Sequence, residues 1–178
     1  MRLETPRLIL ELQTPQELLA LVAKLTPEES ANVSPDSLAR MQAVTVPDIW
    51  AHGFKVMLRE GGSVIGTVGF KSPPTAEGVV EIAYHIHAEQ QRKGFATEAV
   101  QAVVSGVFGS AMAAVIRAHT LHGNEASKRV LAKCGFRFVG EVVEPEDGLV
   151  LRWERERNAL AHAVEMRPQP ACANATAE

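Results

Sequence analysis

The sequence predicts a single domain of the α+β (mixed α/β) class. Two alternating runs, 54–59 and 63–70, are joined by Gly61 and Gly62, a pattern typical of a β-hairpin. The run 96–108 instead has apolar residues at helical spacing. The expected elements follow one another in the order β-α-α-β-β-β-α-β-α-β-β. A length of 178 residues suits one domain, or one domain with a tail.

The first half of the chain opens with an apolar strand at 7–12. The segment 14–17, Thr-Pro-Gln-Glu, combines a capping box with a proline at the first helical position, so a helix should follow it. A second helix start at 34–35, Ser-Pro, precedes a helical stretch at 38–44. After the hairpin, residues 79–87 form the next expected strand.

The second half continues with a strand at 115–121. Asn124 is a good N-cap for the helix that follows, and Gly135 is the left-handed glycine that usually ends one. Two further strands, 136–143 and 148–154, make a last hairpin. We therefore expect a domain at 1–157.

The remaining residues, 158–178, are rich in alanine, broken by proline and without an apolar period. We expect them to form a flexible C-terminal tail.

Composition argues against several classes of function. The formal net charge of −3 gives no reason to expect nucleic acid binding. No apolar run approaches the ~20 residues that span a bilayer, so no membrane association is expected. The start of the chain lacks the apolar region of a signal peptide, which leaves a cytoplasmic protein as the default. The cysteines and histidines show no ligand spacing, so no metal is expected.

The most informative run is 91–99, Gln-Arg-Lys-Gly-Phe-Ala-Thr-Glu-Ala. It joins a strand to a helix start, where backbone N–H groups lack internal partners and the helix dipole favours an anion. Gly94 lets the backbone approach a ligand closely, and Arg92 and Lys93 add positive charge. Neither the Walker string nor G-x-G-x-x-G occurs. The expected ligand is a pyrophosphate or a similar anion.

Four segments in the same order carry a resemblance to a known family. They are Leu3–Leu10, Val80–Ile86, the run 91–99, and Asn124-Glu125-Ala126-Ser127 followed by Cys134-Gly135-Phe136. Together they resemble the GNAT N-acetyltransferases, and more narrowly the RimJ/RimL-like branch that acetylates the N-termini of ribosomal proteins. The resemblance covers about residues 3–155.

The resemblance implies a twisted, mostly antiparallel sheet of about six to seven strands with helices on both faces. The fourth and fifth strands, here 79–87 and 115–121, would splay apart, and acetyl-CoA would lie in the opening. It also implies a monomer or homodimer whose partners are acetyl-CoA and an amine acceptor, with no nucleic acid.

The same resemblance assigns the cofactor-binding residues. The backbone of the fourth strand would pair with pantetheine, as an unpaired edge can pair with amides. The loop N–H groups would hold the pyrophosphate, and the signature asparagine would bond the coenzyme or brace the loop. The implied residues are Tyr84, His85 and Ile86 on the strand, Arg92, Lys93, Gly94, Phe95, Ala96 and Thr97 in the loop, and Asn124.

The implied reaction is direct attack of an amine on the thioester. An α-amine, with a pKa of about 7.8, is more often neutral than a lysine, with a pKa of about 10.4, and so needs only a weak base. Glu81, among apolar neighbours, is the first candidate for that base; the alternative is a solvent-facing or ion-paired strand residue. His119 is the second candidate, and its alternative is a sheet histidine bonded to backbone.

A departure from the family concerns the acid that protonates the leaving thiolate. Many relatives carry a tyrosine seven residues after the signature asparagine, and this chain has Leu131 there. Ser127 could donate to the sulfur instead, or could simply bond the helix backbone. Three functions therefore stay open: a protein N-terminal acetyltransferase, an acetyltransferase for a small amine or antibiotic, and a non-catalytic acyl-CoA-binding sensor or interaction module.

Overall fold

The computed structural model describes residues 1–24, 38–39, 42–145 and 147–157. Within this range, eight strands form one sheet in the order β1-β2-β3-β4-β5-β6-β8-β7. Neighbouring strands are antiparallel except for β5 and β6, which are parallel. The strands are β1 (Arg2–Glu4), β2 (Leu8–Leu12), β3 (Phe54–Leu58), β4 (Val64–Phe70), β5 (Val79–Ile86), β6 (Val115–Thr120), β7 (Arg137–Glu144) and β8 (Gly148–Glu156).

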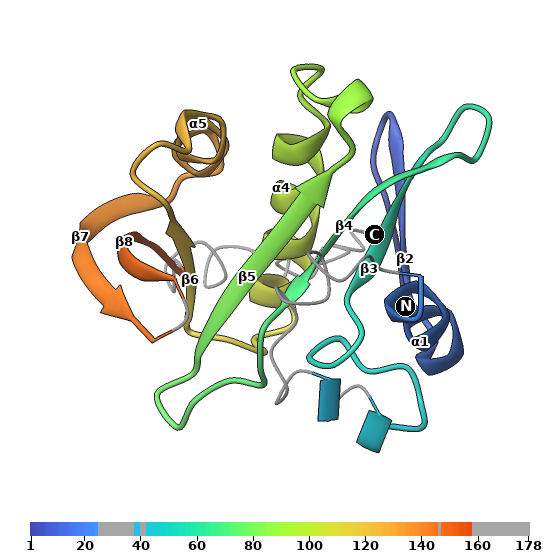
Figure 1. Cartoon of the computed structure of the whole chain (residues 1–178), viewed down its shortest axis with the longest axis horizontal. Coiled ribbons are helices and arrows are strands. Elements are labelled where there is room, and N and C mark those ends of the chain that lie inside the picture. Colours follow the sequence, from blue (N-terminus) through green and yellow to red (C-terminus); the bar gives the residue numbers. More distant parts are fainter. Residues whose placement is uncertain (25–37, 40–41, 146, 158–178) are drawn as a thin grey trace, which may run out of the picture.

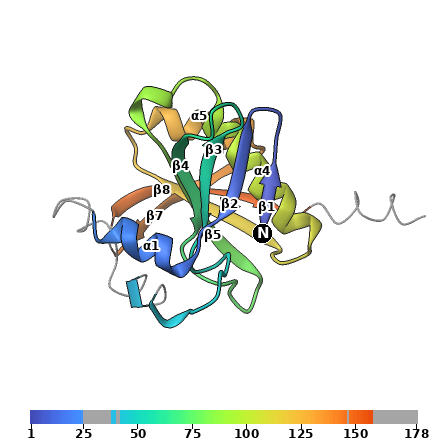
Figure 2. The same ribbon diagram turned by 90° about the vertical axis from the view of Figure 1, so that its right-hand side faces the viewer.

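The helices are α1 (Pro15–Val22), the short 3-10 turn η1 (Ala88–Gln90), α4 (Phe95–Gly109) and α5 (Glu125–Lys133). α4 contacts β1, β2, β4 and β5, and Figure 2 shows it beside β1 and β2. The buried face of α4 is the one that the helical spacing predicted: Ala99, Val100, Val103, Val104, Val107 and Phe108. Among the described helices, none is long and apolar enough to cross a membrane.

The sheet opens between β5 and β6, as the family resemblance predicted. The two strands pair only from Val79 and Val115 to Glu81 and Arg117. Beyond that point β5 continues to pair with β4, while β6 pairs with β8. Figure 1 shows the two strands separating toward α5. Residues Ile82–Ile86 therefore present one edge that no described strand covers.

Local sequence signals explain where the helices begin and end. Thr14 and Glu17 form the predicted capping box at the start of α1. Asn124 caps α5 by accepting a hydrogen bond from the backbone N–H of Ser127 at 3.0 Å. Gly135, with φ +78°, lies just after α5, and the N–H of Phe136 donates to Leu131 O at 3.0 Å, which makes a Schellman ending.

The start of the chain differs from the prediction. The sequence predicted one strand at 7–12, but the chain forms two, β1 and β2, paired antiparallel. The N–H of Thr5 donates to Leu8 O at 3.0 Å, and this turn folds the first residues back along the second strand. The sheet consequently has eight strands rather than six or seven. The predicted tail at 158–178 and most of the predicted helix from 34 onward lie outside the described residues.

Candidate active site

The predicted anion loop connects β5 to α4 through η1 and a tight turn. Gly94 is the N-cap of α4 and has φ +83°, a conformation that glycine adopts without strain. Arg92 also has a positive φ, +62°, which is uncommon for a residue with a side chain. The first-turn N–H groups of α4 have no partners within the helix and carry the positive end of its dipole. The geometry is that of an anion cradle.

The start of the chain holds this loop through Glu98, in the first turn of α4. One carboxylate oxygen of Glu98 accepts hydrogen bonds from Thr5 Oγ1 at 2.6 Å and from the Arg7 backbone N–H at 2.9 Å. The other accepts from Arg7 Nε at 2.7 Å. Burial raises the pKa of Glu98, but these hydrogen bonds outweigh burial and hold the pKa below its ordinary value.

Arg7 links the same carboxylate to the loop itself. Its Nη1 donates to Lys93 O at 2.9 Å, and its guanidinium lies 4.7 Å from the centroid of the Phe95 ring. The turn between β1 and β2 thus braces the anion loop. The sequence contained both halves of this arrangement, in 5–7 and in 97–99, but nothing in the spacing joined them.

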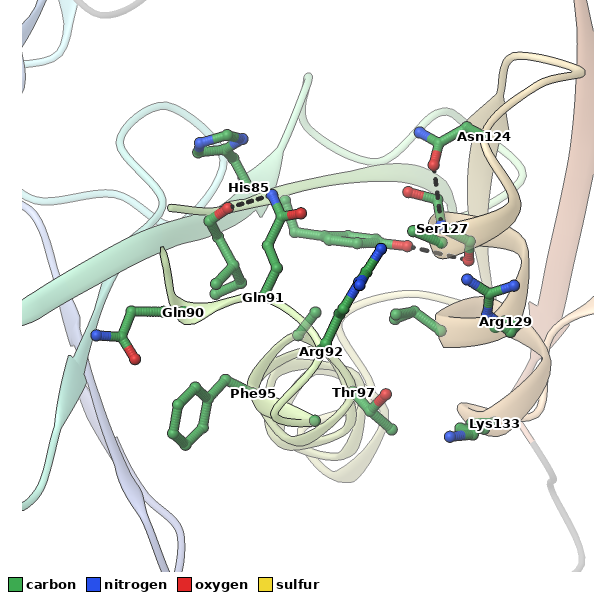
Figure 3. A pocket seen from close by; sticks show the side chains of 16 residues that line it. His85, Gln90, Gln91, Arg92, Phe95, Thr97, Asn124, Ser127, Arg129 and Lys133 are labelled. Carbon is green, nitrogen blue, oxygen red and sulfur yellow. Dashed lines mark hydrogen bonds between the residues drawn. The ribbon is translucent and has the colours of Figure 1, made fainter. Parts of the chain in front are cut away.

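A cleft of about 570 Å³ lies along the open edge of β5, the loop and α5. It contains every predicted cofactor-binding residue except Lys93, whose Nζ donates to Gln90 Oε1 at 2.9 Å. Figure 3 shows these side chains around the opening. The cleft also has lining residues that were not among the predicted cofactor-binding residues: Gln90, Gln91, Ala126, Ser127, Arg129, Val130 and Lys133.

Positive charge enters this cleft from both walls. Arg92 belongs to the loop, and Arg129 and Lys133 come from α5 on the opposite side (Figure 3). A spacing of four residues places Arg129 and Lys133 on one side of the helix, and this spacing was the signal available in the sequence. Together the three cations suit a ligand with several phosphates.

The backbone of β5 offers hydrogen bonds to the cleft at alternate residues. Glu81 O accepts a hydrogen bond from the Lys71 N–H, and the His87 N–H donates to Ile65 O. The backbone N–H and C=O groups of the odd-numbered residues of β5 therefore face β4. The N–H and C=O groups of Tyr84 and Ile86 therefore point into the opening. Ile86 O already accepts from Gln91 Nε2 at 2.9 Å. His85, predicted to pair through its backbone, directs its backbone N–H and C=O toward β4, although the residue does line the cleft.

A second cavity of about 250 Å³ adjoins the cleft. Tyr84, Asn124 and Ser127 line both spaces, so they form the boundary between them. Glu81 and His119 line the second cavity only. A molecule in the cleft could therefore meet a second molecule that approaches from the side of these two residues.

The two alternative bases, Glu81 and His119, turn out to be neighbours. Glu81 Oε1 lies 3.1 Å from His119 Nδ1 and 2.7 Å from Lys71 Nζ. The separation from His119 is that of a hydrogen bond, although Nδ1 has no well-aligned partner among the described residues. Glu81 is thus both ion-paired, as its alternative interpretation held, and directed into the cavity. The side chain of His119 is 5% exposed and bonds side chains, not backbone.

One hydrogen bond between the boundary residues crosses the opening. Tyr84 Oη donates to Ser127 O in a long bond of 3.4 Å, and burial raises the pKa of Tyr84 to about 12. The Ser127 hydroxyl makes no hydrogen bond to another described residue. Leu131, at the position where the family resemblance led us to expect a tyrosine, is fully buried and lines the second cavity.

Two further candidate chemistries have little support in this region. Cys134 is buried beneath the end of α5, its Sγ lies 3.6 Å from Thr97 O, and burial raises its pKa to about 11. A thiol in that state is a poor nucleophile. Among the described residues, no group of three or more His, Cys, Asp or Glu side chains is arranged to hold a metal ion.

Comparison with known proteins by sequence shows the family, and comparison with solved structures shows the fold. The acetyltransferase (GNAT) domain family matches residues 7–137. The uncharacterized N-acetyltransferase YoaA of Bacillus subtilis is 33% identical over 150 residues, which are 78% of this chain and 84% of that protein.

Two solved structures illustrate the likeness in fold. RimL, a ribosomal protein α-N-acetyltransferase in complex with coenzyme A, has a TM-score of 0.69 at 15% identity, over 89% of this chain and 99% of that one. An aminoglycoside acetyltransferase in complex with coenzyme A has a TM-score of 0.62 at 21% identity, over 88% and 99%. This chain belongs to the GNAT family of acetyltransferases.

Proposed function

We propose that this protein transfers an acetyl group from acetyl-CoA to a primary amine by direct attack. The proposal rests on one observation: the 570 Å³ cleft and the 250 Å³ cavity share part of their lining. The cleft has an anion loop and three cations, the adjoining cavity has a carboxylate, and Tyr84, Asn124 and Ser127 line both. A thioester at that boundary would be open to an amine from the cavity.

The donor would lie along the cleft. The pyrophosphate fits the first-turn N–H groups of α4, from Gly94 to Thr97, with Arg92 beside them. The pantetheine amides fit the open edge at Tyr84 and Ile86. Arg129 and Lys133 would face the remaining phosphate oxygens. The bound coenzyme A of RimL and of the aminoglycoside enzyme supports this choice of donor.

Transfer requires a neutral amine and a route for its protons. Glu81 would accept the first proton of the ammonium form. The amine nitrogen then attacks the thioester carbonyl, a C–N bond forms, and the C–S bond breaks to release a thiolate. The nitrogen loses a second proton, which ends on the sulfur. The free N–H groups at the open edge of β5 lie where they could stabilise the carbonyl oxygen as it gains charge.

A protein N-terminal α-amine is the acceptor that we favour. Its pKa of about 7.8 leaves it partly neutral at physiological pH, so it needs less help from a base than a lysine would. RimL provides a precedent in the same fold. The aminoglycoside enzyme supports the competing choice of a small cationic amine, which the acidic Glu81 and Asp147 of the cavity would also attract.

The experiment that decides between these acceptors follows thiol release from acetyl-CoA. The protein is incubated with N-terminal peptides, the same peptides with a blocked α-amine and an internal lysine, polyamines, and aminoglycosides. We expect turnover with free α-amines and none with the blocked peptides. Turnover with aminoglycosides alone would replace the protein acceptor by an antibiotic. Binding of acetyl-CoA without turnover on any amine would favour a sensor.

A second experiment tests the donor site independently of the acceptor. Gly94→Glu and Gly94→Gln introduce side chains of the same size at φ +83°, so they share the backbone strain and differ in charge. We expect the glutamate variant to bind acetyl-CoA far more weakly than the glutamine variant, measured by calorimetry. Equal affinities in two folded variants would remove the pyrophosphate from this loop.

A further inference from the structure

A continuous chain of charged contacts centred on His119 begins in the second cavity and runs beyond its lining. On one side, Nδ1 lies 3.1 Å from Glu81 Oε1, and Glu81 lies 2.7 Å from Lys71 Nζ. On the other side, Arg152 Nε donates to His119 Nε2 at 3.2 Å. Glu144 Oε1 lies 3.4 Å from Arg152 Nη2 and 3.5 Å from His119 Nε2. His119 is thus held between two carboxylates and an arginine.

The register of the sheet builds this arrangement. His119 on β6 lies directly opposite Arg152 on β8, so their side chains share a face. Glu81 joins the same face because Glu81 of β5 pairs with Arg117, two residues before His119. Glu144, near the end of β7, completes the group through Arg152. Tyr84 and Asp147 are the other titratable residues among those that line this cavity.

The proton of His119 has one position that satisfies both neighbours. An arginine Nε–H can only donate, so His119 Nε2 must accept and carries no proton. A proton on Nε2 would point toward the arginine N–H. A neutral ring with its proton on Nε2 would also leave Nδ1 and Glu81 Oε1 as two acceptors 3.1 Å apart. The neutral Nδ1–H tautomer alone avoids both conflicts.

We infer that Arg152, itself held by Glu144, is a positioning residue that fixes His119 as the neutral Nδ1–H tautomer and thereby leaves Glu81 as the proton acceptor. The inference rests on the proposed acetyl transfer. In that tautomer the Nδ1–H lies beside Glu81 Oε1, 3.1 Å away but not yet aligned with it, and His119 takes no proton from the amine. Donor–acceptor pairs of this kind often align fully only when substrate arrives.

Nitrogen NMR of the histidine side chains tests the tautomer without any need for turnover. The His119 signals are assigned by their loss in His119→Gln. We expect a protonated Nδ1 and an unprotonated Nε2 through neutral pH in the wild-type protein. A protonated Nε2, alone or together with Nδ1, would overturn the inference. Because this readout needs no acceptor, it stands even if the protein proves not to acetylate amines.

Kinetics of Arg152 variants test the functional consequence. Arg152→Met removes the donor at similar length, and we expect up to about 10²-fold loss of kcat with the KM for acetyl-CoA unchanged. The acid limb of the pH–rate profile should also move toward neutral pH, because His119 can then take up a proton. Arg152→Lys keeps a hydrogen-bond donor, so it should restore part of the lost kcat and part of the original position of the acid limb.

Arg117→Met is the matched control. It removes a second arginine from the same sheet face, where Arg117 Nε bonds Glu154 Oε1 at 2.8 Å. We expect it to leave the His119 tautomer and the pH–rate profile unchanged.

An unchanged profile in a folded Arg152→Met variant would show that Arg152 is structural only. If Arg152→Met does not fold, Glu144→Gln is the alternative variant, because it loosens Arg152 in place. It should move the acid limb of the pH–rate profile toward neutral pH as well. An unchanged profile in Glu144→Gln would count against the inference.

Discussion

At the scale of single residues, the contacts of Glu98 connect the chain start to the proposed donor site. The carboxylate is mostly buried, with 15% of its side chain exposed, and it binds Arg7 at 2.6 Å. We expect Glu98→Gln to lower the free energy of unfolding at pH 7 by about 1.5–3 kcal/mol, the range for the loss of hydrogen bonds to a charged group. Acetyl-CoA affinity should fall with it, because the loop loses its brace.

The stabilisation that Glu98 provides should decrease in acid. The pKa of Glu98 is lower in the folded protein than its ordinary value of 4.5. The stabilisation is therefore fully present above that value and is lost as the pH falls through the lowered folded pKa. Urea unfolding at several pH values should show the wild type and Glu98→Gln converging in acid. Glu125→Gln, an exposed first-turn glutamate of α5, is the control, and an equal effect there would argue against a specific role.

Cys134 supplies a second prediction for a single residue. Its thiol is 2% exposed and its pKa is raised to about 11 by burial. In a Cys172→Ser variant, in which Cys134 is the one remaining cysteine, we expect no reaction with a thiol reagent until the protein is unfolded. Labelling of the native protein at the rate of a free thiol would show that this end of α5 opens readily.

At the scale of elements, the N-cap of α5 also forms part of the proposed site. Asn124→Ala removes the side chain that accepts from the Ser127 N–H, and it should cost about 1 kcal/mol of unfolding free energy. Since Asn124 lines both cavities, acetyl-CoA affinity should fall too. Asn124→Asp keeps the cap and should keep the stability.

Thr14→Ala is the matched control for this helix. It removes the equivalent cap of α1, which lies away from the cleft, so it should lower stability with acetyl-CoA affinity unchanged. Thermal unfolding and calorimetry of the variants separate the two effects. Equal losses of affinity in both alanine variants would mean that the cap acts through global stability alone.

Local chemistry made these elements predictable. The capping box at Thr14, the glycine at 135 and the apolar spacing of α4 are each set by residues within a turn or two, and each was confirmed. The opening between β5 and β6 was predicted only through family resemblance. The extra strand β1 was missed because three residues carry no usable period.

Contacts between distant residues were not predictable in the same way. Glu98 and Arg7 are 91 residues apart, and no local pattern joins them. Glu81 and His119 were ranked as alternatives because their contact depends on how β5, β6 and β8 align. A one-residue shift in that alignment would turn one of them to the other face of the sheet. Sequence therefore identified the residues, and the fold determined their relation.

At the scale of the whole molecule, the described strands end near Arg157, whose N–H donates to Ala114 O at 2.9 Å. We expect a chain that ends at Arg157 to keep the unfolding temperature and the acetyl-CoA affinity of the full chain, as a domain boundary at 1–157 requires. Thermal unfolding and calorimetry check both quantities. A large loss of either would place residues beyond 157 in the domain.

In the proposed reaction, one opening in the sheet brings acetyl-CoA on one side to an amine on the other, beside Glu81. Mass spectrometry of a peptide with a free α-amine, incubated with acetyl-CoA and either the wild type or Glu81→Gln, tests it most directly. We expect acetylation of the α-amine by the wild type, and a rate lower by about 10²-fold or more in the variant, because a general base is lost. An unmodified peptide, or equal rates with both proteins, would contradict it.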